Sequence, residues 1–107
     1  MAFAIRIVQL NKLLVADHKE FVLSRQLLRS GTAVGAMVRE AEHAESKADF
    51  IHKLAIAQKE INESLYWLEL LFHTDYLSLI EYNSLETDAV ELLKLLTSSI
   101  RTAKSRL

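Results

Sequence analysis

The sequence predicts an all-α protein, an antiparallel up-down four-helix bundle formed by a single domain over residues 1–107. The chain has no proline and only two glycines, so it cannot form the many tight turns of an all-β fold. Its nineteen leucines and twelve alanines favour helix. Apolar residues recur at spacings of three and four in four segments separated by short polar breaks, which is the pattern of amphipathic helices.

The first predicted helix covers residues 2–14 and carries an apolar stripe on one face. Asp17 and Glu20 then have the spacing of a capping box, which predicts a break near 15–18 and a second helix over 18–44. The stripe of the first helix is Phe3, Ile7, Leu10 and Leu14. The apolar positions of the second are Phe21, Leu27, Leu28, Val34, Val38 and Ala41.

A serine cap begins each of the two remaining predicted helices. Ser46 marks the start of a third helix over 47–74. Residues 75–83 are expected to form a loop, after which Ser84 caps a fourth helix that ends near residue 105. The stripe of the third helix is Phe50, Leu54, Ala57, Ile61, Leu65, Leu68 and Phe72. The stripe of the fourth is Leu85, Ala89, Leu92, Leu96, Ile100, Ala103 and Leu107.

Both glycines lie inside the second predicted helix. Gly31 and Gly35 are four residues apart, and each costs about 1 kcal/mol relative to alanine in a helix. Thr32, Ala33 and Ala36 extend this surface of small side chains. The pattern favours a close helix crossing, with a ligand groove as the alternative. A close crossing at Gly35 predicts that Gly35→Leu overpacks the protein.

Three of the helices have more apolar residues than one bundle core needs. The additional residues are Ala4, Ile5 and Val8 in the first helix, Ile51, Ile56, Trp67 and Leu70 in the third, and Val90, Leu93 and Leu95 in the fourth. An exposed apolar surface of this kind usually marks an interface, so we expect self-association through helix faces. The alternative is that these residues cover one another at the bundle ends or under the 75–83 loop.

Composition excludes several classes of protein. Without cysteine, the chain cannot form disulfides, thiolate metal sites or a cysteine nucleophile. A net charge of −1 provides no overall attraction to nucleic acid or anionic lipid. No apolar run approaches the length of a membrane span, and the N-terminal segment lacks the pattern of a secretion signal. We therefore expect a cytoplasmic protein without a membrane partner.

Candidate catalytic and metal-binding groups are sparse. Glu40 with His43, and Asp49 with His52, have the i, i+3 spacing found in di-iron bundles, but both pairs fall at one end of the predicted bundle. Surface polar residues explain them better. No serine lies in a nucleophile-elbow motif, and the two glycines do not form a phosphate-binding loop. The sequence therefore predicts a protein that is not an enzyme, with no metal and no cofactor.

The third helix carries one polar strip beside its core stripe. Lys53, Glu60, Glu63 and Trp67 make up this strip. Two carboxylates three residues apart could act in acid–base chemistry if they were buried. An ion pair with a neighbouring helix is the preferred interpretation, with Arg29 and Arg39 as candidate partners.

Charge is polarised along the fourth helix. Acidic residues come early, and the basic residues Lys94, Arg101, Lys104 and Arg106 come late. This arrangement complements the helix dipole. In a ring of subunits the basic ends would also converge into a multivalent surface for phosphates, which makes these residues candidate nucleic-acid contacts. No aromatic residue is interleaved with them, so stacking on single strands is not indicated.

Three segments resemble a known family. They are RSGTAVGAMVREA at 29–41, SKADFIHKL at 46–54 and AQKEINESLYWLELL at 57–71. They resemble the four-helix-bundle family named after proteins encoded in intervening sequences of 23S ribosomal RNA genes. The matching residues are Arg29, Ser30, Thr32, Gly35, Glu40, Ala41, Lys53, Glu60, Glu63 and Trp67. Ala33 and Met37 stand where the family usually has serine and asparagine, and the proline that many members carry after the first helix is missing.

The resemblance implies an antiparallel four-helix bundle that assembles as a homopentameric ring and has no known enzymatic activity. Related accessory proteins of diversity-generating retroelements form pentamers, bind nucleic acid through a basic surface and partner a reverse transcriptase. The favoured interpretation is a homo-oligomeric scaffold that binds other proteins. The alternative is an accessory protein that binds RNA or an RNA/DNA hybrid.

Overall fold

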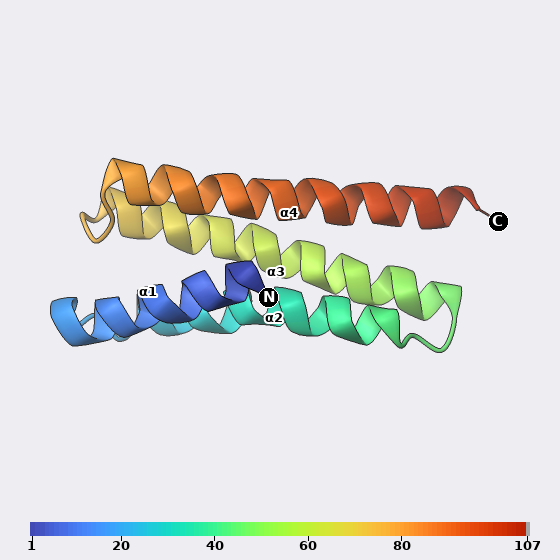
Figure 1. The fold of residues 1–107 in the computed structure, drawn as a ribbon, viewed down its shortest axis with the longest axis horizontal. Coiled ribbons are helices and arrows are strands. Elements are labelled where there is room, and N and C mark those ends of the chain that lie inside the picture. Colours follow the sequence, from blue (N-terminus) through green and yellow to red (C-terminus); the bar gives the residue numbers. More distant parts are fainter. Residues whose placement is uncertain (107) are drawn as a thin grey trace.

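The computed structural model describes residues 1–106, and these residues form four α-helices and no strand. The helices are α1 (Ala2–His18), α2 (Leu23–Glu42), α3 (Lys47–His73) and α4 (Leu79–Ser105). Each runs antiparallel to the one before it, with α1 packed on α2, α2 on α3 and α3 on α4 (Figure 1). The predicted all-α four-helix bundle is confirmed. No helix in this part of the chain combines the length and the apolar composition that crossing a lipid bilayer requires.

The core follows the predicted stripes closely in α1 and less closely in α3. All four stripe residues of α1 are buried. In α3 the buried side chains are Leu54, Ala57, Ile61, Ser64, Leu68 and Leu71. Phe50, Leu65 and Phe72, which the sequence placed in the core stripe, are only half-buried. The buried face of α3 alternates spacings of four and three from Ala57 onward, so it includes Ser64 rather than Leu65.

The connection between α1 and α2 lies later than predicted. Helix α1 continues to His18, and Lys19 ends it in the left-handed conformation with φ of 54°. The predicted capping box of Asp17 with Glu20 is wrong, because Asp17 lies in the last turn of α1. Phe21, expected inside the second helix, precedes α2 and is exposed.

The N-terminus of α2 is capped by a buried carboxylate. Glu20 accepts hydrogen bonds from the backbone N–H groups of Val22, Leu23 and Ser24 at 3.1, 2.9 and 2.7 Å. Burial alone would raise the pKa of Glu20, but the N–H donors of Leu23 and Ser24 outweigh burial and lower the pKa below its ordinary value of 4.5. This single side chain satisfies three of the backbone donors that a helix N-terminus leaves unpaired.

The start of α4 also differs from the prediction, whereas the start of α3 agrees with it. The Ser46 side chain accepts the backbone N–H of Asp49 and caps α3 as expected. Helix α4 begins at Leu79, because Ser78 and Glu81 form a complete capping box. The predicted Ser84 cap is therefore wrong. Leu107, which the sequence placed on the α4 stripe, lies outside the described residues.

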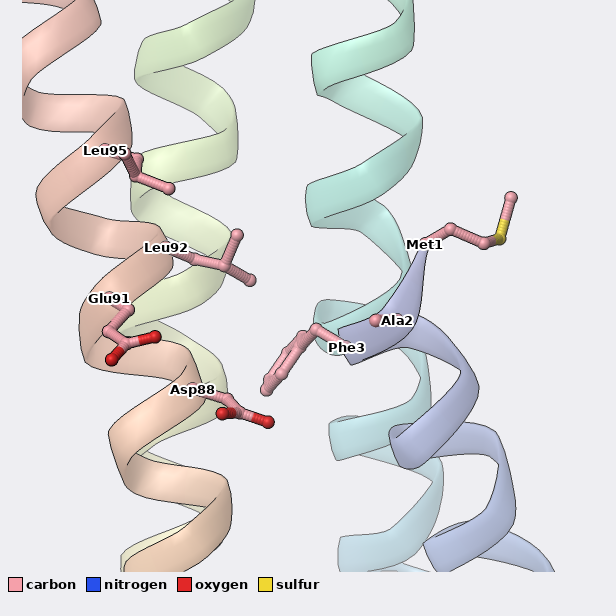
Figure 2. Close-up of a pocket in the computed structure, with 7 residues that line it drawn as sticks. All are labelled: Met1, Ala2, Phe3, Asp88, Glu91, Leu92 and Leu95. Atoms are coloured by element: carbon pink, nitrogen blue, oxygen red, sulfur yellow. The ribbon is translucent and has the colours of Figure 1, made fainter.

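Helix α1 covers only half the length of the bundle. It has 17 residues, whereas α3 and α4 have 27 each, and its N-terminus lies midway along the molecule (Figure 1). A hollow of about 300 Å³ opens between this terminus and α4, as Figure 2 shows. Leu95 of α4 lines the hollow and is 64% exposed. In the half of the molecule that α1 does not reach, the bundle therefore has three helices rather than four (Figure 1).

Candidate functional site

An ion-pair cluster joins α2 to α3 and contains four of the family-signature residues. Arg29 of α2 binds Glu60 at 3.2 Å and also binds Glu63. The indole N–H of Trp67 donates to the same Glu63 carboxylate at 3.1 Å. Partial desolvation alone would lower the pKa of Arg29, but attraction to Glu63 and then to Glu60 raises it above its ordinary value. Of the two arginines proposed as partners, Arg29 occupies this position.

This cluster suits structural pairing better than acid–base chemistry. Glu60 and Glu63 share one guanidinium, so each carboxylate is already bound to a cation. The pairing fixes the register of α2 against α3, because residues i and i+3 of α3 lie on the side that faces Arg29. Arg29 is half exposed, so the pair contributes less than about 1 kcal/mol to stability.

A second pair lies further along the same two helices. Lys53 of α3 binds Glu40 of α2 at 3.1 Å, and the hydrogen bond and charge of Glu40 raise the pKa of Lys53 above its ordinary value. Glu40 was also one of the carboxylates in the alternative metal site with His43. Within residues 1–106, no three His, Asp or Glu side chains come together as metal ligands.

A buried hydroxyl pair also crosses the α2–α3 contact. The hydroxyl groups of Ser30 and Ser64 lie 2.8 Å apart, and both residues are fully buried. The Ser64 hydroxyl donates to the carbonyl of Glu60 at 3.0 Å, and because it has one hydrogen it then accepts from Ser30. The sequence identified Ser30 through the family motif but missed Ser64. Ser64 lies three residues after Ile61 and four before Leu68, which are both core positions, so this spacing was the available signal.

The two glycines have different surroundings. A Cβ atom on Gly31 would lie 2.9 Å from both Cγ atoms of Ile7, so α1 crosses α2 closely at this point. A Cβ atom on Gly35 would meet nothing within 4 Å. The predicted close crossing at Gly35 is wrong, and the expected overpacking by Gly35→Leu loses its basis, since a Cβ atom there has open space. Gly35 instead lines an open groove beside the N-terminus of α1, together with Thr32 and Ala36.

The basic residues of α4 form a stripe rather than a tip. Lys94, Arg101 and Lys104 share one face of the helix at spacings of seven and three, and all three are exposed. Arg101 and Lys104 line a shallow groove with Gln58 of α3. Arg106 follows the helix, and its carbonyl accepts a hydrogen bond from Lys47. Within residues 1–106 none of the four predicted cations forms an ion pair.

Part of the surplus apolar surface is exposed. The large apolar residues that reach solvent are Met1, Ile5, Val8, Leu13, Phe21, Val22, Tyr66, Leu79, Ile80 and Leu95. Ile51, Ile56, Trp67, Leu70, Val90 and Leu93 are half-buried. The sequence therefore identified Ile5, Val8 and Leu95 correctly as surface residues. It missed the exposed apolar residues at the two turns, because it placed Phe21 inside a helix and residues 75–83 in a loop.

Comparisons with known proteins identify a family and a solved structure that this chain resembles. The model of the family described as 23S rRNA-intervening sequence protein matches residues 1–98. A crystal structure from Bacteroides thetaiotaomicron VPI-5482, described as a protein with unknown function from the S23 ribosomal protein family, has 57% sequence identity and a TM-score of 0.93. The match covers 94% of this chain and 89% of that chain, whereas no curated protein matches. The chain belongs to the family of 23S rRNA-intervening sequence proteins.

Proposed function

We propose that this chain is a non-enzymatic, homo-oligomeric scaffold whose helix faces bind further copies of itself and then partner proteins. The observation that supports this proposal best is the exposed apolar surface. Ten large apolar side chains reach solvent among residues 1–106 of a 12.2 kDa protein. Several of them are grouped, as Met1, Ile5 and Val8 are on one face of α1, and grouped exposed apolar side chains often mark an interaction surface.

The free energy gained by burying these side chains can be compared with the free-energy cost of association. Complete burial of one exposed Val, Leu, Ile or Met side chain contributes about 1.5–3 kcal/mol. Association costs about 4–15 kcal/mol in translational and rotational freedom. These side chains are already partly buried, so each gains less than that, and several must be buried together to offset even the lower part of that cost.

The ion-pair cluster supports a scaffold rather than an enzyme. Arg29, Glu60, Glu63 and Trp67 satisfy one another, and no buried polar side-chain atom among residues 1–106 lacks a partner. An active site normally keeps at least one polar group available for substrate. These contacts support a role of the motif's polar residues in the packing of α2 on α3.

The oligomeric state tests the proposal directly. Size-exclusion chromatography with light scattering measures the mass in solution without reference to shape. Scaffold function predicts a mass several times 12.2 kDa, and the pentamer implied by the family resemblance corresponds to about 61 kDa. A monomer that persists at high micromolar concentration contradicts the proposal.

A second candidate function is nucleic-acid binding through the basic stripe of α4. After Glu91 the chain has four cations and no acidic residue, and Arg101 and Lys104 border one groove. The description of the Bacteroides protein, which names a ribosomal protein family, is consistent with an RNA partner. Oligomerisation would multiply a weak contact of this kind, because linked sites bind with a high effective concentration.

Salt dependence distinguishes this second candidate from non-specific adhesion. Binding of a labelled RNA hairpin is measured by fluorescence anisotropy over a range of salt concentrations. Removing two phosphate contacts with Arg101→Ala and Lys104→Ala should weaken binding and reduce the magnitude of the slope of log affinity against log salt by roughly 1.4–1.8 per subunit. Arg25→Ala with Arg39→Ala on α2 removes the same charge elsewhere and should leave the slope unchanged. Equal effects of the two double variants contradict a site on α4.

A further inference from the structure

One face of α1 is apolar although it points away from the bundle core. Met1, Ile5 and Val8 follow one another at i, i+4 and i+7, on the side opposite the buried residues Phe3 and Ile7. They are 78, 49 and 36% exposed. A helix that packs only on its own bundle has no use for a second apolar face, so this α1 stripe (Met1, Ile5 and Val8) is available to another surface.

The α1 stripe lies in a cationic segment. Residues 1–16 contain Arg6 and Lys12 and no acidic residue. Arg6 forms an ion pair with Asp88 of α4, on the side of α1 that faces its own bundle. Lys12 follows Val8 by four residues, so it continues the stripe toward the α1–α2 turn, and it is exposed.

The outer side of α3 carries an apolar patch with the opposite charge. Tyr66 is 57% exposed, and with Leu70, Glu69 and His73 it lines a hollow of about 170 Å³. This α3 patch lies on the side of α3 away from the buried residue Leu68. Within residues 1–106 the one ion-pair contact of Glu69 is with His73, a surface histidine 3.9 Å away, so its carboxylate is open to a further cation.

The stripe and the patch cannot meet within one molecule. Helix α1 packs on α2, whereas α3 lies between α2 and α4 (Figure 1). Each surface lies on the side of its helix opposite the buried residues, so the two do not face each other. Both lie in the half of the bundle that the α1–α2 and α3–α4 turns close. His18 and Tyr76, at these two turns, pack edge to face with ring centroids 5.7 Å apart. Complementary surfaces on different sides of one molecule favour head-to-tail association, which closes into a ring when the rotation between copies allows it.

From this arrangement we infer that the α1 stripe of one copy docks on the α3 patch of the next copy, with Lys12 of the first beside Glu69 of the second. This inference rests on the proposed self-association and specifies its interface. The apolar residues supply the contact area, and the charge pair selects the partner surface.

Disulfide trapping tests the position of the interface, because the native chain has no cysteine. One copy carries Ile5→Cys and a differently sized copy carries Leu70→Cys, and the mixture is oxidised gently. The inferred contact predicts efficient formation of the mixed disulfide. Ala55→Cys is the matched control, since it is exposed on the same helix about 22 Å further along. Equal trapping by Leu70→Cys and Ala55→Cys overturns the inference.

Charge reversal provides an independent measurement that needs no covalent bond. Lys12→Glu and Glu69→Lys should each raise the dissociation constant of the assembly at least tenfold at low salt, because like charges then face each other. The variant that carries both reversals should recover most of the affinity. Lys59→Glu, elsewhere on α3, should have no effect. Failure of the double reversal to recover overturns the inference, whereas a monomeric native protein overturns the proposed self-association itself.

Discussion

The close crossing of α1 over α2 at Gly31 determines whether a methyl group added at this position stabilises or destabilises the protein. Gly31→Ala adds one methyl group at 2.9 Å from two Cγ atoms of Ile7, a residue with no exposed surface. The gain in helix propensity is about 1 kcal/mol. Overpacking at a buried β-branched residue costs about 1–3 kcal/mol. We therefore expect a net loss of stability of up to about 2 kcal/mol.

Gly35→Ala is the matched control for this substitution. It adds the same methyl group to the same helix, but the new Cβ atom meets nothing within 4 Å. Only the propensity gain remains, so this variant should be more stable than the native protein by about 1 kcal/mol. The two variants should differ by about 1–3 kcal/mol, which is roughly 4 °C or more in Tm for a domain of this size.

Thermal unfolding followed by circular dichroism, at one fixed protein concentration, measures both variants. The reasoning predicts the order Gly35→Ala, native protein, Gly31→Ala, from most to least stable. Ile7→Ala should reduce the penalty of Gly31→Ala, because it removes the two Cγ atoms that the new methyl group meets. Equal stabilisation by the two alanine substitutions would refute the close crossing.

Three further predictions concern caps and buried hydroxyl groups. Glu20 has a lowered pKa, so its contribution to stability is present above pH 4.5 and is lost as pH falls below that value. Glu20→Gln should cost about 1 kcal/mol at neutral pH, and the free energy of urea unfolding should then fall less steeply as the pH is lowered into the acid range. If the variant and the native protein lose stability equally with falling pH, the cap is contradicted. Ser64→Ala should lower the free energy of unfolding by about 1–3 kcal/mol. The double variant with Ser30→Ala should lose less stability than the sum of the two single variants. If the losses measured by denaturant unfolding add strictly, the hydroxyl pair is ruled out. Ser78→Ala should cost about 1 kcal/mol and Ser84→Ala less than about 0.5 kcal/mol, and the reverse order of melting temperatures would place the α4 cap at Ser84.

Periodicity predicted the number and type of helices because each stripe is long. The buried residues of α1 and the range of α3 agree with the prediction within one residue. Helix boundaries were less accurate, since caps depend on single side chains. Ser78 followed by Glu81 satisfies the capping-box pattern fully, whereas Ser84 lacks an acidic residue three positions later. The complete capping box at Ser78 and Glu81 is thus the stronger sequence signal for the start of α4.

Other features depend on how helices cross, which one sequence does not encode locally. Gly31 and Gly35 look equivalent along α2, but α1 passes close only to Gly31 and begins beside Gly35. Arg29 and Arg39 were equivalent candidates for the acidic strip, and only Arg29 lies level with Glu60 on α3. The signature residues could be identified from the motif alone. Which of them contact one another could be seen only once the packing of α2 on α3 was known.

Self-association through exposed helix faces is the central claim, and the mass of the native protein in solution tests it most directly. Light scattering after size exclusion, repeated from high to low micromolar concentration, gives that mass. The account predicts a discrete assembly several times 12.2 kDa that dissociates on dilution and is weakened by Lys12→Glu. A mass of 12.2 kDa at every concentration would contradict it.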